Sequence, residues 1–268
     1  MTSTPRTPFE PDERPSVARM YDYMLGGHHN FAADRELADR VIALQPDFPL
    51  IMRANRAFLR RAVAFLVSQG ITQFLDIGSG IPTVGNVHEV AQSLLPTARV
   101  VYVDIDPVAV VHANSILEGN SYAIAIQADA RRPEDILGHP EVRALLDFDK
   151  PMAVLLVAFL HFVLDEQVAQ DIVERLRESV ASGSYIVISH AVHTFSPETE
   201  REAVDLYNRT NATVRVRSSE EVVGFFKGLD VVEPGIVLAP LWRPEDPDDL
   251  FVHTPERSGM LAGIGRKP

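Results

Sequence analysis

Short apolar runs alternate along the chain with longer segments of helical spacing. Runs of strand length begin at Phe74 and cover residues 99–104, 122–129, 152–158 and 184–189. Between them, apolar residues recur at helical intervals over residues 49–69, 83–95 and 166–180. Strands that alternate with helices are typical of a parallel sheet covered by helices on both faces. The pattern therefore predicts an α/β fold, and the runs at 229–237 and 259–266 predict a closing pair of strands.

The chain before the first strand has a different pattern. Residues 1–15 contain four prolines among polar residues, which predicts a mobile tail. Residues 16–70 predict a cap of helices, with one helix that ends near Gly26-Gly27 and a second over 32–44. Residues 71–268 then form the ligand-binding domain. We expect the segment 19–30 to fold over the ligand as a lid, because it joins aromatic and polar residues to a flexible glycine pair.

The first strand ends in a glycine turn, Gly78-Ser79-Gly80, that lets a ligand approach the backbone. Asp76 adds a hydrogen-bond acceptor just before it. A dinucleotide fingerprint would need a third glycine where Thr83 stands, so a pyrophosphate cradle is not supported. The next two strands also stop at acids, Asp104 and Asp129, and an α/β nucleotide site places such an acid on the ribose hydroxyls.

Together, the glycine turn and the strand-end acids resemble the class I S-adenosylmethionine-dependent methyltransferases. The segment Tyr21-Asp-Tyr-Met-Leu-Gly-Gly-His-His-Asn-Phe-Ala-Ala-Asp-Arg, with Asn86-Val-His-Glu-Val-Ala and Trp242-Arg-Pro-Glu, is similar to a bacterial S-adenosyl methyltransferase family formerly catalogued as a domain of unknown function. The resemblance covers nearly the whole chain. It implies a Rossmann-like fold with a seven-stranded, mostly parallel sheet, an antiparallel last strand and an N-terminal helical extension.

The resemblance also implies the cofactor, S-adenosyl-L-methionine, and the product, S-adenosyl-L-homocysteine. The resemblance implies that the amino-acid part of the cofactor binds at the glycine turn, the ribose at Asp104 and the adenine at Asp129. For Gly26 and Gly27 a simple helix-ending turn is an equal alternative to ligand contact. The candidate cofactor-binding residues are Tyr21, Gly26, Gly27, Asp76, Gly78, Ser79, Gly80, Thr83, Asn86, His88, Asp104, Ile105, Asp129, Ala130 and Phe159.

Two histidines are candidate catalytic residues. His161 follows the fourth strand, which in the resembled enzymes borders the transferable methyl group, although a structural role is an equal alternative. His190 ends the fifth strand. His190 and His193 have no third ligand at a recognisable spacing, so we predict no metal. The face of Arg53, Arg56 and Arg60 is either solvated or a clamp for an acidic substrate.

Composition narrows the class of partner. The formal charge of −12 disfavours nucleic acid, whose binding depends on clustered Lys and Arg, and leaves a small molecule or a protein. The absence of cysteine fits a reducing compartment. The longest apolar run, residues 152–160, is too short to cross a bilayer. We expect a cytoplasmic protein, a monomer or homodimer, that does not bind membranes.

The sequence thus favours a methyltransferase that acts on a small molecule by in-line displacement, in which alignment contributes more than a base. A protein that binds the same cofactor without turnover, as a sensor or regulator, would share every glycine and acid. A nicotinamide-dependent oxidoreductase is disfavoured by the missing third glycine.

Overall fold

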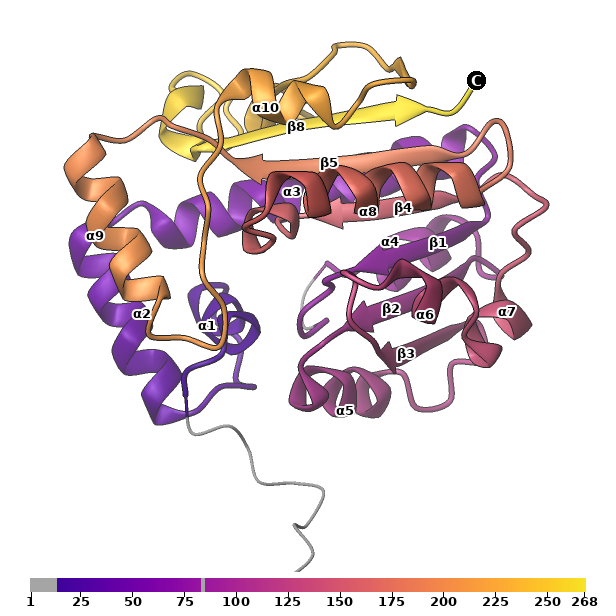
Figure 1. Ribbon diagram of the computed structural model, residues 1–268, viewed down its shortest axis with the longest axis horizontal. Coiled ribbons are helices and arrows are strands. Elements are labelled where there is room, and N and C mark those ends of the chain that lie inside the picture. The colour runs from indigo at the N-terminus through magenta and orange to yellow at the C-terminus, as the bar shows by residue number, and fades with distance from the viewer. Residues whose placement is uncertain (1–13, 83–84) are drawn as a thin grey trace, which may run out of the picture.

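The strands form one mixed sheet in the order β3-β2-β1-β4-β5-β8-β6, with β7 paired to β8 (Figure 1). The computed structural model describes residues 14–82 and 85–268. Neighbours among β1–β5 are parallel, and β8 runs antiparallel to β5. This confirms the predicted α/β fold with an antiparallel last strand. The strands are β1 (Gln73–Ile77), β2 (Arg99–Asp104), β3 (Ala123–Gln127), β4 (Ala153–Val157), β5 (Tyr185–Ala191), β6 (Asp230–Val231), β7 (Val237–Leu238) and β8 (Met260–Arg266).

The closing part of the sheet differs in detail from the prediction. The run predicted as one strand over 229–237 forms two short strands, β6 and β7, which both pair with β8. Pro234 lies between them and has no N–H to donate to a ladder. Gly235 follows with a positive φ of 99°. Within residues 14–82 and 85–268 the sheet therefore has eight strands, where the sequence predicted seven.

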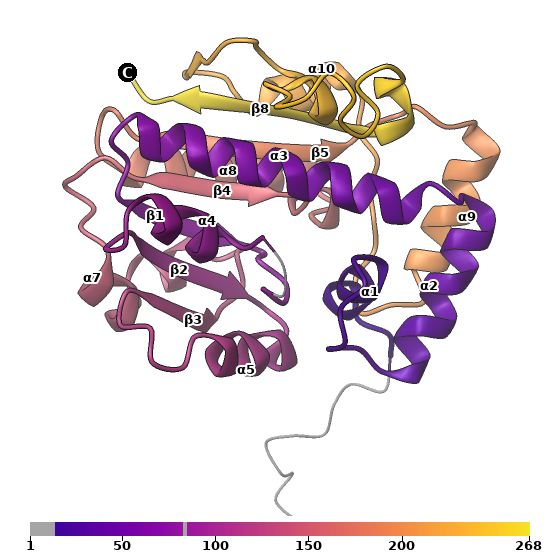
Figure 2. The same cartoon turned by 180° about the vertical axis from the view of Figure 1, so that it is seen from behind.

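Helices cover both faces of the sheet (Figures 1 and 2). The core on one face takes side chains from α3, α4 and α5, and the other takes them from α6, α7, α8 and α10. None of the helices in the described part of the chain is long and apolar enough to span a membrane. The helices are α1 (Val17–Met24), α2 (Ala32–Leu44), α3 (Phe48–Ser68), α4 (Val87–Leu94), α5 (Pro107–Ile116), α6 (Pro133–Leu137), α7 (Pro140–Leu145), α8 (Glu166–Ser179), α9 (Pro197–Tyr207) and α10 (Ser219–Gly224), with 3₁₀ turns η1 (Leu160–Phe162), η2 (Ala239–Leu241) and η3 (Pro255–Ser258).

A separate helical layer lies beyond the carboxyl ends of the parallel strands (Figure 2). Its small core consists of Met20, Met24, Leu37, Ala38 and Val41, from α1 and α2, with α9 packed against it. The helix α3, which we assigned to the cap, instead packs along the sheet. The predicted tail over 1–15 lies almost wholly outside the described residues.

Buried polar contacts hold the cap against the end of β2. The Ser16 hydroxyl donates to Asp106 at 2.6 Å, and Arg19 pairs with Asp34 at 2.7 Å and lies 3.7 Å from Asp106. Asp106 also accepts from the Val108 amide at 2.9 Å, which makes it the N-cap of α5. One carboxylate therefore fixes both α5 and the start of α1.

The loop after β4 is held by a fully buried arginine, Arg217. Its guanidinium donates to the carbonyls of Leu160 at 3.0 Å and Val163 at 2.8 Å. It also forms an ion pair with Glu166 at 2.6 Å. Because these groups flank η1, Arg217 sets the position of the loop that follows β4.

We expect Arg217→Ala to lower the free energy of unfolding by about 3 kcal/mol, because it leaves two buried carbonyls and Glu166 without their partner. This loss of stability is at the low end of the range for removing one partner of a buried ion pair, because the Glu166 side chain stays partly exposed to solvent. Chemical denaturation measures the change. Arg175→Ala, which removes an exposed arginine paired with Glu134, is the control and should leave the midpoint unchanged. Equal midpoints for the two variants would contradict this role of Arg217.

Candidate active site

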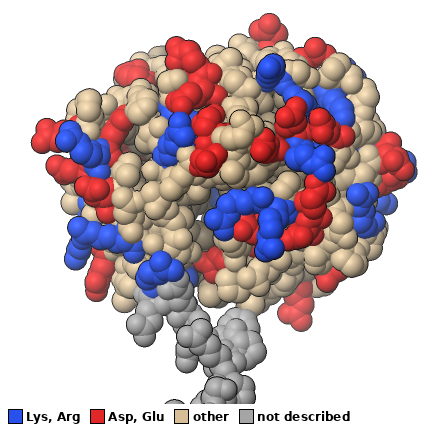
Figure 3. Space-filling model, in the orientation of Figure 1, with Lys and Arg blue, Asp and Glu red and all other residues tan. Residues whose placement is uncertain are grey.

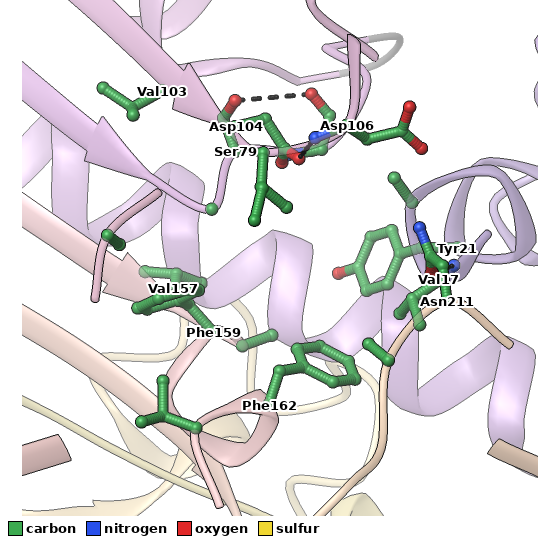
Figure 4. Close-up of a pocket in the computed structure, with 18 of the residues that line it drawn as sticks. Val17, Tyr21, Ser79, Val103, Asp104, Asp106, Val157, Phe159, Phe162 and Asn211 are labelled. Atoms are coloured by element: carbon green, nitrogen blue, oxygen red, sulfur yellow. Dashed lines mark hydrogen bonds between the residues drawn. The ribbon is translucent and has the colours of Figure 1, made fainter. Parts of the chain in front are cut away.

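A cavity of about 540 Å³ opens at the carboxyl ends of β1, β2 and β4. This volume lies within the range of roughly 300–1,000 Å³ typical of small-molecule sites. Figure 3 shows the surface hollowed at this place, with side chains of both charge signs nearby. Figure 4 shows that the strand ends form one side and that Val17, Tyr21 and Asn211 face them from the other. The site therefore lies between the sheet and the helical cap.

The glycine turn after β1 is tied to the end of β2. The Gly78 amide donates to the Val103 carbonyl at 2.8 Å, and the Gly80 amide donates to Asp104 at 2.8 Å. Gly78 has a φ of 68°, and a Cβ there would lie 2.3 Å from the Phe159 ring. Only glycine suits this position, because both the backbone angle and the contact with Phe159 exclude a side chain.

Two carboxyls lie at adjacent strand ends, Asp76 buried and Asp104 half-buried, and both line the cavity. Burial raises the pKa of Asp76 to about 7, with a further contribution from Asp104, and nearby Arg56 opposes the rise. Burial also raises the pKa of Asp104, while amide donors from Asp106 at 2.9 Å and Gly80 at 2.8 Å oppose it. Neither carboxyl forms a salt bridge within the described residues. This end of the cavity therefore favours a cation or a donor of hydrogen bonds.

The third predicted acid, Asp129, also lines the cavity but already has a partner. Arg131 donates to its two oxygens at 2.9 and 2.7 Å, which lowers the pKa of Asp129. Ile105 and Ala130 line the same part of the cavity. Ser79 and Phe159 line it as well. The structure thus brings together most of the residues that the sequence predicted.

The side of the cavity formed by α1 and α3 adds a residue that the sequence did not assign. Arg56 lines the cavity, and its guanidinium lies 5.4 Å from the centre of the Tyr21 ring. Its Nε is buried and has no hydrogen-bond partner in the described structure. By contrast, Arg53 is exposed and Arg60 pairs with Glu245. Of the predicted basic face, only Arg56 faces this cavity.

Four candidate residues, His88, Asn86, Gly26 and Gly27, do not line the cavity. The Tyr102 hydroxyl accepts from the His88 amide at 2.8 Å and contacts His88 Nδ1 at 2.7 Å. Asn86 precedes α4, which begins at Val87 rather than at the predicted residue 83. Gly26 and Gly27 form the turn that ends α1, and neither is among the residues that line the cavity. Thr83 lies outside the described residues.

The two candidate catalytic histidines are in different surroundings. His190 lies inside β5, where Nδ1 donates to the Ala191 carbonyl at 2.7 Å and Nε2 accepts from Arg217 at 2.8 Å. Burial lowers the pKa of His190 to about 4. His161 does not line this cavity but a smaller neighbouring one. Within 14–82 and 85–268, no group of three His, Asp or Glu residues could hold a metal ion.

Comparison with known proteins assigns the family. The sequence profile of a family described as S-adenosyl methyltransferase matches residues 7–268. The chain belongs to this S-adenosyl methyltransferase family. Its cofactor is accordingly S-adenosylmethionine, as the sequence predicted.

Solved structures agree with this assignment. A candidate methyltransferase from Thermobifida fusca is 42% identical with a TM-score of 0.88, and the match covers 95% of each chain. A DUF574 family protein from Streptomyces avermitilis is 41% identical with a TM-score of 0.89, over 96% of this chain and 98% of that one. The N-methyltransferase NodS from Bradyrhizobium japonicum, in complex with S-adenosylhomocysteine, shares the fold at 14% identity and a TM-score of 0.51, over 93% and 99% of the two chains. No curated protein matches.

We expect Asp104→Ala to weaken S-adenosylhomocysteine binding by about ten- to a hundredfold, because the ribose hydroxyls of the ligand would lose the carboxylate that is expected to accept their hydrogen bonds. Asp129→Ala should have a smaller effect, because Asp129 is already paired with Arg131. Isothermal calorimetry on the folded variants measures both. Unchanged affinity in Asp104→Ala would remove this residue from the site, and a larger loss in Asp129→Ala would reverse the order.

Proposed function

We propose that this methyltransferase transfers the methyl group to a small molecule and that Asp76 and Arg56 bind the amino-acid end of the cofactor. The supporting observation is that Asp76 and Arg56, whose Nε has no hydrogen-bond partner among the described residues, line the same cavity as the glycine turn. A free amino acid carries one ammonium and one carboxylate, so it matches this pair in charge. The sequence left open that Arg53, Arg56 and Arg60 bind an acidic substrate. Of these three, only Arg56 lines the cavity, and we assign it to the carboxylate of the cofactor.

The residues present fit S-adenosylmethionine along its whole length. Arg56 would hold the carboxylate, Asp76 the ammonium and Asp104 the ribose hydroxyls. Asp129 and Ala130 would border the adenine. The two carboxyls at the strand ends also favour the overall positive charge that the sulfonium and ammonium give the amino-acid end.

The bound cofactor supplies a methyl group on a sulfonium, which is a good leaving group. In an in-line transfer, the acceptor's nucleophilic atom forms a bond to the methyl carbon as the carbon–sulfur bond breaks. The electron pair of that bond stays on sulfur, the product is S-adenosylhomocysteine, and the proton lost by the nucleophile goes to water. The protein's part is to align the two molecules and exclude water, and alignment can contribute roughly 7–11 kcal/mol.

His161 is not arranged as a general base. Burial and the neighbouring His190 and Arg217 lower its pKa well below the usual value for histidine. Its Nδ1 accepts from the Ala191 amide at 3.4 Å, so the neutral ring carries its proton on Nε2. His161 would therefore donate a hydrogen bond rather than remove a proton, and the transfer proposed here does not require a base.

Because Asp76 has a pKa near 7 and a cationic ligand favours its ionised form, binding should be coupled to loss of a proton. We expect the affinity for S-adenosylhomocysteine to rise by about tenfold between pH 6 and pH 8. Calorimetry in two buffers of different ionisation enthalpy measures the proton release. In Asp76→Asn the release should disappear. A pH-independent affinity in the wild-type protein would show that Asp76 does not meet the ammonium.

Turnover tests the proposed function itself. Pools of small hydroxyl and amine compounds are incubated with S-adenosylmethionine and the full chain, and S-adenosylhomocysteine is quantified by mass spectrometry. At least one pool should raise its formation above the rate without acceptor. Cofactor binding with no stimulation by any pool would instead support a protein that binds the cofactor without catalysis.

The same assay tests the role of Arg56. Arg56→Gln should raise the KM for S-adenosylmethionine about tenfold or more, because it removes a charged donor. Arg53→Gln changes an exposed arginine of the same helix and is the matched control. Equal KM values for the two variants would contradict the proposed contact.

A further inference from the structure

A second, smaller cavity adjoins the cofactor cavity. Its volume is about 100 Å³, and it lies among α1, α3, α9 and the segment around Gly259. Most of the side chains that line it are apolar. Both cavities are lined by Val17, Tyr21, Asn55, Ala158 and Phe162. The second cavity therefore lies directly beside the cofactor cavity, separated from it by this shared wall.

The polar groups of the shared wall are satisfied by one another. Asn55 donates to the Tyr21 hydroxyl at 3.1 Å and accepts from the Ser189 hydroxyl at 2.6 Å. The Tyr21 hydroxyl donates to the Met52 carbonyl at 3.2 Å. Ala158 has a positive φ of 54° and donates to the Ser189 hydroxyl at 2.9 Å. This network fixes the wall, and Figure 4 shows Tyr21 and Phe162 extending toward the cavity from α1 and from the turn after β4.

The far part of the second cavity contains one strongly polar group, Glu200 of α9. It is the one Asp, Glu, Lys or Arg among the described residues that line the cavity. Its Oε2 contacts His193 Nδ1 at 2.7 Å, whereas its Oε1 is buried and has no hydrogen-bond partner among the residues that the structure describes. A buried carboxylate oxygen without a donor is unfavourable, so this end of the cavity favours a ligand that donates hydrogen bonds.

Tyr207, also on α9, adds a second polar group. Burial raises its pKa, so its hydroxyl keeps the proton at neutral pH. No hydrogen bond of this hydroxyl occurs within the described residues. Glu200 and Tyr207 line only the second cavity, whereas the shared wall borders the cofactor.

We propose that the second cavity binds the methyl acceptor and that this acceptor is a small apolar amine whose ammonium binds Glu200. The inference rests on the proposed function and adds the substrate class. The nucleophilic atom lies at the opposite end of the acceptor, at the wall shared with the cofactor. An anionic acceptor is disfavoured, because it would meet the carboxylate of Glu200, and the described lining of the cavity contains no Lys or Arg.

The size of the cavity limits the part of the acceptor that it encloses. An engineered apolar cavity of about 150 Å³ holds benzene, so about 100 Å³ suits a chain of a few carbon atoms. We therefore choose butylamine, 1-butanol and butyrate as probes. They share a four-carbon chain and differ in charge.

Binding of the three probes is measured by ligand-observed NMR on the full chain saturated with S-adenosylhomocysteine. Butylamine should bind more tightly than 1-butanol, and butyrate should not bind. Glu200→Gln should weaken butylamine about tenfold or more while 1-butanol is unaffected, because only the amine uses the carboxylate. Glu202→Gln, an exposed change on the same helix, is the matched control and should leave both affinities unchanged.

A second experiment fills the cavity with a larger side chain. Ala203→Phe should abolish butylamine binding and leave the affinity for S-adenosylhomocysteine unchanged, since Ala203 lines only the second cavity. If Ala203→Phe does not fold, Val214→Phe is used in its place, because Val214 lines the same cavity from another segment. Butylamine binding that survives the filled cavity, equal binding of the three probes, or equal weakening by Glu202→Gln would overturn the inference. If the wild-type protein does not bind S-adenosylhomocysteine at all, that result would count against the proposed function instead.

Discussion

The site depends on two carboxyls that lie side by side where β1 and β2 end, Asp76 buried and Asp104 half-buried. Burying the charge of Asp76 is costly in the absence of a ligand, and its pKa of about 7 expresses that cost, while partial burial raises the pKa of Asp104 as well. The backbone offsets part of it, because the amides of Gly80 and Asp106 donate to Asp104. The same amides shape the glycine turn and the start of α5. The geometry of the site and its preference for a positively charged ligand therefore have one origin.

The helical cap turns this sheet edge into an enclosed site. Asp106 joins the two layers, since it caps α5 and accepts from Ser16 at the start of α1. Tyr21 then forms part of both cavities, with the cofactor cavity on one side and the smaller one on the other. The lid predicted over residues 19–30 overlaps α1, which borders the cavity. The hydrogen bond between Ser16 and Asp106 fixes the beginning of that helix. Movement of this segment on ligand binding stays a prediction.

The sequence predicted the fold and the strand-end residues because their signals are local. A buried strand followed by glycines or an acid reads directly from neighbouring residues, and parallel strands bring such ends to one edge. Arg56 was not singled out, because helical spacing cannot tell which arginine of α3 turns toward the cavity once the helix packs on the sheet.

His190 was assigned to the site because it stood at the end of the predicted fifth strand. In the structure β5 continues to Ala191 and holds this ring against Arg217. The second cavity was also beyond sequence reasoning, since its walls come from segments as distant as α1, α9 and η3. Contacts of this range depend on the completed fold and leave no local pattern.

A crystal structure of the full chain with S-adenosylhomocysteine tests the central claim most directly. The account predicts ribose hydroxyls on Asp104, the ammonium on Asp76 and the carboxylate on Arg56, with the sulfur facing the wall of Tyr21, Asn55 and Phe162. A ligand bound with its amino-acid end away from Asp76 and Arg56, or with its sulfur turned from that wall, would contradict it.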